Sequence, residues 1–321
     1  YFGGDDLDHL YDINESSDGS LVCVGKTRSA NLNNNYHGGT DGWIVKTNSS
    51  GLLQWQRAIG GSGQDYFCSV CTRYVAGQER YEMVGTTRSS DGDTTDFHGA
   101  FDGYFVSINS LGNTLYSTMC LGGSDNDIFK DIISMEDQGL ILIGGSSSKD
   151  SFLSDTYGNG IGWIVRTDNR AQLLWQKRLS EVCSSNSEIS VCKADGGSFA
   201  YTGYNLNSNQ VYSSLPDSNF LLTKLSAEGV MMPFYAGMSF DRQSPQAAGT
   251  SIAVKGVSNL DGVEYRFLCY DQSGAETLLR DWDTDDTVEW IPTVAGEYMV
   301  KTQARMPGYT QYVELDIMKF T

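Results

Sequence analysis

The chain has 321 residues, with 22 lysines and arginines against 40 aspartates and glutamates, so its formal net charge is −18 at pH 7. Phosphate backbones and anionic lipid surfaces bind proteins through clustered Lys and Arg, which argues against nucleic acid or a membrane surface as partner. No apolar run approaches the roughly 20 residues that cross a bilayer, so we expect no membrane insertion.

A repeated unit of about 60 residues fills the first three quarters of the chain, a spacing typical of solenoids and propellers. A degraded fourth copy opens near Ser180. The three clear copies open on a glycine pair followed by an aspartate: Gly3-Gly4 with Asp8, Gly60-Gly61 with Asp65, and Gly122-Gly123 with Asp127.

Each copy contains four short apolar runs separated by turns rich in Gly, Asp and Asn. Short runs of β-branched and aromatic residues bounded by such turns predict strands joined by hairpins. A four-stranded meander cannot bury both faces alone, so neighbouring copies must stack on it. The sequence therefore predicts an all-β fold, a β-propeller of four-stranded antiparallel blades at about 3–59, 60–121, 122–179 and 180–237.

A large aromatic residue opens the third run of every copy, at Trp43, Tyr104, Trp163 and Phe220. Such a series could form a sugar-stacking surface. We expect it instead to fill the gaps between neighbouring blades, because large aromatics dominate cores and function rarely needs the same residue in every repeat.

The N-terminal pair Tyr1-Phe2 aligns with Ala58-Ile59, the end of an outer strand that precedes Gly60. This alignment predicts that the natural protein has further blades upstream.

The spacing of the predicted strands changes after the repeats. Residues 238–243 are predicted to be a short linker, and 244–321 a β-sandwich, because alternating strands follow at intervals of about 8–12 residues. The expected strands cover 251–255, 264–270, 277–282, 287–291, 296–304 and 311–319.

The seven cysteines are an odd number, so at least one thiol stays unpaired within the chain. Cys68 and Cys71 have metal-site spacing, but no second pair follows. We expect most cysteines to be buried thiols and consider only Cys183 with Cys192 for a disulfide.

The repeat resembles the units of secreted bacterial β-propellers from gut anaerobes and Bacteroidetes. The resemblance covers 3–179 well and 180–237 weakly, and it implies only a secreted or surface role. It rests on Gly60-Gly61-Ser62 with Asp65-Tyr66, and on Trp43-Ile44-Val45-Lys46 followed by Gly51 and Trp55.

The tail is similar to the three-tyrosine, Ig-like domains of Firmicutes surface proteins. The match covers 244–321 and implies interaction or spacing rather than catalysis. It rests on Ser244-Pro245-Gln246, Gly249-Thr250, Tyr265-Arg266-Phe267 and Trp290-Ile291-Pro292 with Gly296 and Tyr298.

Long loops between the second and third strands of the blades, at 26–41, 86–102, 145–161 and 204–218, are the expected functional face. The best candidates for stacking on and hydrogen-bonding to a glycan are Tyr36, His98, Asp102 and Tyr157.

Structural roles compete with this interpretation. Asp8, Asp65 and Asp127 stand at one register and are expected to cap the entry to the first strand. His37 and His98 are equivalent, each preceding a Gly and an aspartate, and so are expected to brace their loops.

A Ca²⁺ site is the one cofactor we consider. Asp91-Gly92-Asp93 resembles a fragment of a Ca²⁺-binding loop, but the glutamate that closes such a loop is missing. We therefore name Asp91 and Asp93 as the candidate metal ligands.

No nucleophile elbow, zinc-protease motif or phosphate loop occurs in the chain, and only three histidines are present. The sequence favours an extracellular or cell-surface protein that binds glycan or protein without catalysis. Two alternatives stay open, a glycan-processing enzyme with a carboxylate pair and a purely structural spacer.

Overall fold

The computed structural model describes residues 1–32, 35–116, 118–150, 161–183, 189–205, 219–232, 236–258, 260–310 and 312–320. These residues form strands and a single 3-10 turn, η2 (Asp195–Gly197), and none of them forms a helix long and apolar enough to cross a bilayer. The all-β prediction is confirmed.

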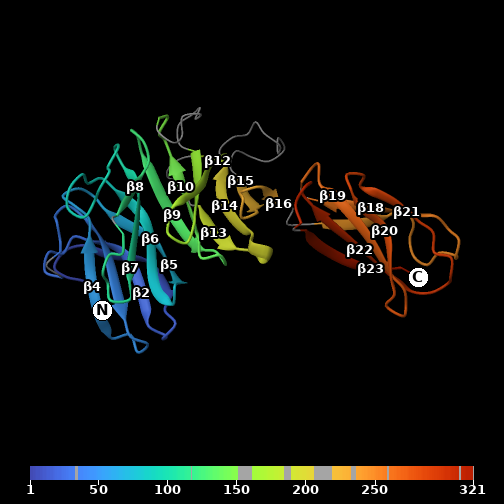
Figure 1. The fold of residues 1–321 in the computed structure, drawn as a ribbon, viewed down its shortest axis with the longest axis horizontal. Helices are drawn as coiled ribbons and strands as arrows, with labels where there is room; N and C mark the ends of the chain where they lie inside the picture. Colours follow the sequence, from blue (N-terminus) through green and yellow to red (C-terminus); the bar gives the residue numbers. More distant parts are fainter. Residues whose placement is uncertain are drawn as a thin grey trace. The chain divides into compact units, whose positions relative to one another are not determined.

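The first four sheets along the chain, the blades, have four strands each (Figure 1). In each sheet, strands adjacent in sequence are adjacent in space, and in the first three sheets all pairs are antiparallel. The blades are β1 (Asp8–Glu15), β2 (Leu21–Thr27), β3 (Asp41–Thr47) and β4 (Leu53–Ile59); β5 (Tyr66–Val75), β6 (Gln78–Thr87), β7 (Asp102–Asn109) and β8 (Met119–Leu121); β9 (Asp127–Ser134), β10 (Leu140–Ser146), β11 (Ile161–Thr167) and β12 (Leu173–Cys183); β13 (Ser190–Lys193), β14 (Phe199–Asn205), β15 (Asn219–Leu225) and β16 (Met231–Met232).

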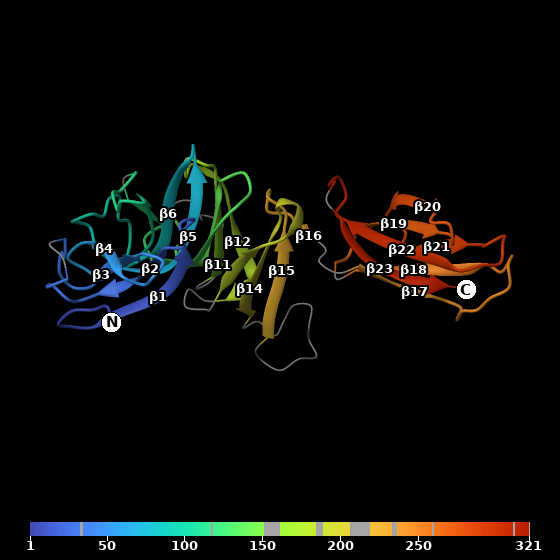
Figure 2. The same cartoon turned by 90° about the horizontal axis from the view of Figure 1, so that it is seen from below.

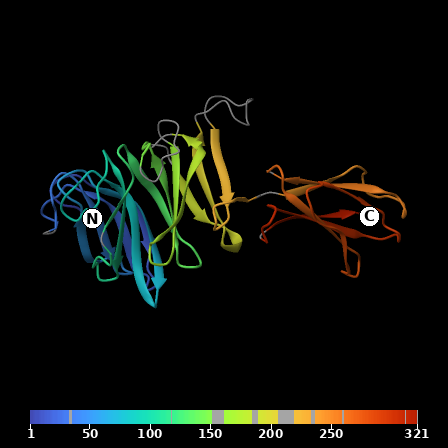
Figure 3. The ribbon, with the colours of Figure 1, turned by 45° about the horizontal axis from the view of Figure 1, so that its top comes forward.

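The first strands of successive blades lie side by side: β1 contacts β5, β5 contacts β9, and β9 contacts β13. Figure 2 shows β1 beside β5, and Figure 3 shows the first three sheets succeeding one another from blue to green. This radial arrangement is that of a β-propeller, whose first strands line a central channel.

The blades are held together by apolar side chains between their faces. Val22, Val24 and Ile44 of the first blade pack with Phe67 and Tyr104 of the second. A second cluster joins blades two and three, where Val84 and Phe105 of the second blade pack with residues of the third. Within the third blade the rings of Phe129 and Trp163 stack with centroids 4.7 Å apart.

The recurrent aromatic residues are therefore packing residues, as expected. Trp43 and Trp163 are 1% exposed and Tyr104 is completely buried. The side chain of Phe220 lies outside the described residues.

A glycine in the second strand of each of the first three blades permits close approach to the first strand. A Cβ atom at Gly25, Gly85 or Gly144 would lie 1.9 Å from the carbonyl oxygen of His9, Tyr66 or Ile128, respectively. At each place the first strand has a β-bulge, so the glycine accommodates the local kink.

The tail forms a two-sheet sandwich around its own apolar core, as predicted. One sheet has the order β17-β18-β21 and the other β20-β19-β22-β23. Its strands are β17 (Ala236–Phe240), β18 (Ile252–Ser258), β19 (Glu264–Tyr270), β20 (Glu276–Asp283), β21 (Thr287–Trp290), β22 (Tyr298–Arg305) and β23 (Val313–Phe320).

The expected linker at 238–243 is partly wrong. Met238 and Phe240 belong to β17, which pairs with β18, and both side chains pack on the sandwich core. By contact density the chain divides into two compact units, Tyr1–Lys193 with Ala200–Leu222, and Ala194–Phe199 with Thr223–Thr321.

The thiols agree with the structural expectation, with one correction. Cys71, Cys120 and Cys269 are buried and free. Cys192 is an exposed free thiol, so the disulfide considered with Cys183 is not formed.

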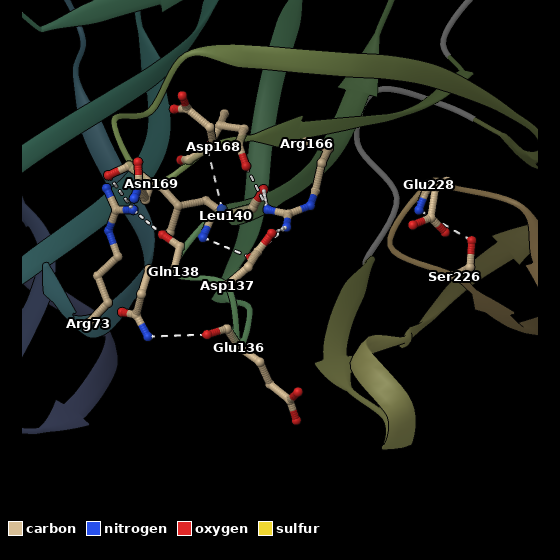
Figure 4. A network of polar contacts seen from close by, with 12 residues as sticks. Arg73, Glu136, Asp137, Gln138, Leu140, Arg166, Asp168, Asn169, Ser226 and Glu228 are labelled. Carbon is tan, nitrogen blue, oxygen red and sulfur yellow. Dashed lines mark hydrogen bonds and ion pairs between the residues drawn. The ribbon is translucent and has the colours of Figure 1, made fainter. Parts of the chain in front are cut away.

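A buried ion pair stabilises the second blade. Arg73 of β5 and Glu82 of β6 are both fully buried, and Nε of Arg73 donates to Oε1 of Glu82 over 2.7 Å. The same guanidinium donates to the carbonyl oxygens of Gln138 and, at 3.2 Å, Asn169, in two turns of the third blade (Figure 4). Arg73 therefore connects adjacent blades as well as neutralising Glu82.

Replacing Arg73 with alanine should lower the free energy of unfolding by about 3–5 kcal/mol, because the buried Glu82 would lose its hydrogen-bonded counter-charge. Chemical denaturation measures this. The double variant Arg73→Met with Glu82→Leu should recover most of the loss, and exposed Arg170→Ala should change stability by less than about 0.5 kcal/mol. A loss below about 1 kcal/mol for Arg73→Ala would contradict the role assigned to this pair.

Candidate functional site

The loop residues predicted to bind a ligand are engaged mainly with their own loops. The Tyr36 hydroxyl is partly buried and donates to the carbonyl oxygen of Gly39 over 3.0 Å. Tyr157 lies outside the described residues. Tyr36 thus holds its loop rather than standing free.

The two His-Asp pairs repeat one geometry. The Oδ2 atom of Asp102 accepts the backbone N–H of His98 over 2.7 Å and lies 3.1 Å from its Nδ1. For Asp41 and His37 the two distances are 2.8 and 3.2 Å. Asp102 is fully buried, and the loop-brace interpretation fits both histidines. A ligand-binding role for His98 and Asp102 stays a prediction.

The candidate metal ligands are also used by the turns. Asp91 Oδ1 accepts the backbone N–H of Ser62 over 2.7 Å, and this bond lowers the pKa of Asp91. Asp93 Oδ2 lies 3.4 Å from the N–H of Gly60. The part of the chain that the structure describes contains no cluster of three or more His, Cys, Asp or Glu suited to a metal, so a Ca²⁺ site at this pair stays a prediction.

The aspartates of the glycine turns are buried caps, as expected. Asp65 is fully buried and accepts the N–H of Gly61 and the hydroxyl of Ser89, each over 2.8 Å. Asp127 makes the equivalent bonds in the next blade. These bonds fix the entry of each first strand and leave the carboxylates unavailable to a ligand.

The described first strands carry alternating Asp and Ser residues at one register. Asp12 Oδ2 accepts the Ser69 hydroxyl over 2.9 Å and the Val70 N–H over 2.8 Å. Ser69 Oγ also lies 2.8 Å from Asp131 Oδ1, although a hydroxyl has only one proton to donate. Two carboxylates therefore converge on one serine.

The pattern continues into the fourth blade. Asp131 Oδ2 accepts the Ser190 hydroxyl over 2.6 Å and the Val191 N–H over 2.8 Å. These polar groups connect first strands directly across blade junctions. They border a cavity of about 400 Å³ that also includes Asn14, Thr72 and Lys193.

A second cavity, of about 250 Å³, lies toward the other end of the first strands, between blades one and two. We call it the junction pocket. Its lining residues are Leu7, His9, Lys26, Arg28, Thr40, Gln64 and Tyr66.

The backbone defines the junction pocket closely. His9 and Lys26 are direct cross-strand partners in β1 and β2. Thr40 and Gln64 form a parallel bridge between the blades, flanked by a 2.6 Å bond from the Asp65 N–H to the Thr40 carbonyl. The pocket wall therefore combines strand residues of β1, β2 and β5 with loop residues that backbone hydrogen bonds hold in place.

The junction pocket combines rings, charge and hydrogen-bonding groups. Lys26 Nζ lies 5.7 Å from the centroid of the Tyr11 ring and 6.0 Å from that of Tyr66. Burial raises the pKa of Tyr66 to about 12, so its hydroxyl stays a neutral donor and acceptor. Gln64 and Thr40 add an amide and a hydroxyl to the wall.

No family model matches the chain, and no curated protein matches it. Among solved structures, the chain is similar to an α-L-arabinofuranosidase from Lactobacillus brevis, with 12% identity over 78% of this chain and 84% of that chain and a TM-score of 0.37. It is also similar to a xylan β-1,4-xylosidase from Bacillus halodurans C-125, with 9% identity over 95% and 77% of the two chains and a TM-score of 0.38.

Stability should depend on Asp41 through pH. Burial raises the pKa of Asp41 from 3.8 to about 6, so the folded protein binds a proton there more tightly than the unfolded chain. The resulting stabilisation is complete below the unfolded pKa and is lost as pH rises through the folded pKa. Relative to Asp41→Asn, the wild type should lose on the order of 2 kcal/mol between about pH 4 and about pH 6, measured by denaturation at each pH.

Asp91→Asn is the matched control, because the lowered pKa of Asp91 gives a contribution of opposite sign, lost as pH falls. If the free energies of unfolding of the wild type and Asp41→Asn changed in parallel with pH, the raised pKa of Asp41 would be contradicted.

Proposed function

We propose that this protein is an extracellular glycan-binding propeller without catalytic activity, and that the junction pocket is its binding site. The observation that carries the proposal is the pocket itself, where an aromatic ring, an amide, a hydroxyl and cationic groups converge on one cavity. Binding sites typically pair apolar surface with a few placed polar groups.

The size of the junction pocket limits the ligand. A cavity of about 250 Å³ is below the range of roughly 300–1,000 Å³ usual for drug-sized ligands. We expect it to hold one sugar residue, with the rest of a glycan lying over the loop-bearing face.

The enzyme alternative rests on Asp12 and Asp131, which contact the same Ser69 oxygen. Retaining glycosidases use two carboxyl groups held close together across the scissile bond, and these two aspartates are the carboxylate pair that a shared partner brings together. However, both carboxylates accept backbone N–H groups of adjacent blades. We therefore assign them to holding the blades together.

The spacer alternative concerns the second unit. We propose that the sandwich is an Ig-like interaction or spacing domain, because its seven strands enclose a core of their own. A spacer alone gives no reason for the polar cavity between blades one and two.

A glycan array should show selective binding by the wild type. Replacing Tyr66 with leucine should weaken binding at least about tenfold, because ring stacking and a hydroxyl partner are lost together. Titration calorimetry on the best array ligand measures this. Tyr309→Leu is the control, since Tyr309 belongs to the second unit.

The same panel of polysaccharides should be assayed for released reducing sugar. We expect none from the wild type. Turnover that Asp12→Asn or Asp131→Asn abolishes, while the melting temperature holds, would establish the enzyme alternative instead. Absence of any array ligand would leave the spacer as the better account.

A further inference from the structure

Positive charge is scarce in this chain, yet it gathers at the junction pocket. Only 22 of the 321 residues are Lys or Arg, and two of them, Lys26 and Arg28, line this one small cavity together with His9. Lys26 and His9 face the second blade, since Val22 and Val24, which alternate with Lys26 on the same face of β2, pack against it.

The charge of Lys26 is not neutralised by the protein. Among the described residues, no carboxylate lies within 4.0 Å of its ammonium group, whose contacts are the faces of Tyr11 and Tyr66. Arg28 has one distant partner, Asp6, with Nε and Oδ2 4.0 Å apart and both side chains about half exposed. Such an exposed pair contributes little and leaves the guanidinium available.

The next blade junction provides an internal comparison. There Tyr66 pairs with Thr86, as His9 pairs with Lys26 in the first blade. Phe101 occupies the bridging position of Thr40, and Arg88 lies over its ring, 5.4 Å from the centroid. At the second junction a threonine therefore stands at the position of Lys26. The remaining cation there, Arg88, lies over the ring of Phe101.

From this contrast we infer that the junction pocket recognises an acidic sugar, one that carries a carboxylate or a sulfate group. The inference rests on the proposed function and narrows its ligand class. Lys26 and Arg28 would bind the acid group, and the face of Tyr66 would contact the sugar ring. Charge-assisted hydrogen bonds to an acid group are about twice as strong as neutral ones, which would give selectivity over neutral sugars.

The test is titration calorimetry of the full chain with three probes, namely trigalacturonate, a sulfated galactotriose and neutral galactotriose. At least one acidic probe should bind at least about tenfold more tightly than the neutral one, and the affinity should fall as salt rises. The acidic probe that binds distinguishes a uronate from a sulfated ligand.

Lys26→Met should weaken the acidic probe about tenfold or more, with little change in binding of the neutral one. Lys177→Met is the matched control, because it removes the same charge from a lysine that also lies over an aromatic ring, Trp175, at 5.6 Å. Asp6→Asn should strengthen binding of the acidic probe. The melting temperature of Lys26→Met should change little, since among the described residues Lys26 makes no ion pair and its two ring contacts are long, at 5.7 and 6.0 Å.

Equal affinity for acidic and neutral probes would overturn the inference and leave the proposed function intact. Equal weakening by Lys26→Met and Lys177→Met would also overturn it, because general attraction to a charged ligand would then suffice. If neither these probes nor any glycan on the array binds, the proposed function fails as well.

Discussion

The burial of aromatic side chains between neighbouring blades is the constraint on which the rest of this structure depends. A four-stranded sheet with two apolar faces cannot be stable alone, and Tyr104 and Trp163 are buried where adjacent sheets meet. That packing forces the first strands side by side. Residues more than fifty positions apart, such as Asp12 and Ser69, then come within hydrogen-bonding distance.

Polar groups at the blade junctions follow from the same geometry. Carboxylates near the first strands are used as acceptors, either for the glycine turns, as with Asp65, or for the next blade, as with Asp12. The repeat therefore uses most of its acidic groups for structure. The junctions differ from one another at the few aligned positions where one repeat has a different residue from the others. The junction pocket contains such a position.

Much of this fold could be predicted from the sequence, because its signals are local. Strands, turns and the recurrent aromatic residues follow from short patterns, and the tail strand at 264–270 was expected with the bounds it has. The linker was less predictable, since Met238 and Phe240 show their role only once β18 lies beside them. The roles of the loop residues are harder to predict, because a ligand-binding histidine and a bracing one look alike in sequence, as His98 illustrates.

The pocket required the three-dimensional arrangement. Lys26 and Tyr66 are forty residues apart and belong to different blades, and neither is unusual alone. One sequence signal did exist, because Lys26 aligns with Thr86 and Gly145, so a charged residue replaces small ones at an inward-facing position. A comparison of the repeats that looks for differences at one aligned position, rather than for shared residues, identifies Lys26.

The most direct measurement is a crystal structure of the protein with a bound acidic trisaccharide. The account predicts one sugar residue in the junction pocket, with its acid group within hydrogen-bonding distance of Lys26 Nζ and its ring against Tyr66. A ligand held instead by loop 86–102, or in the cavity of about 400 Å³ beside Asp12 and Asp131, would contradict it.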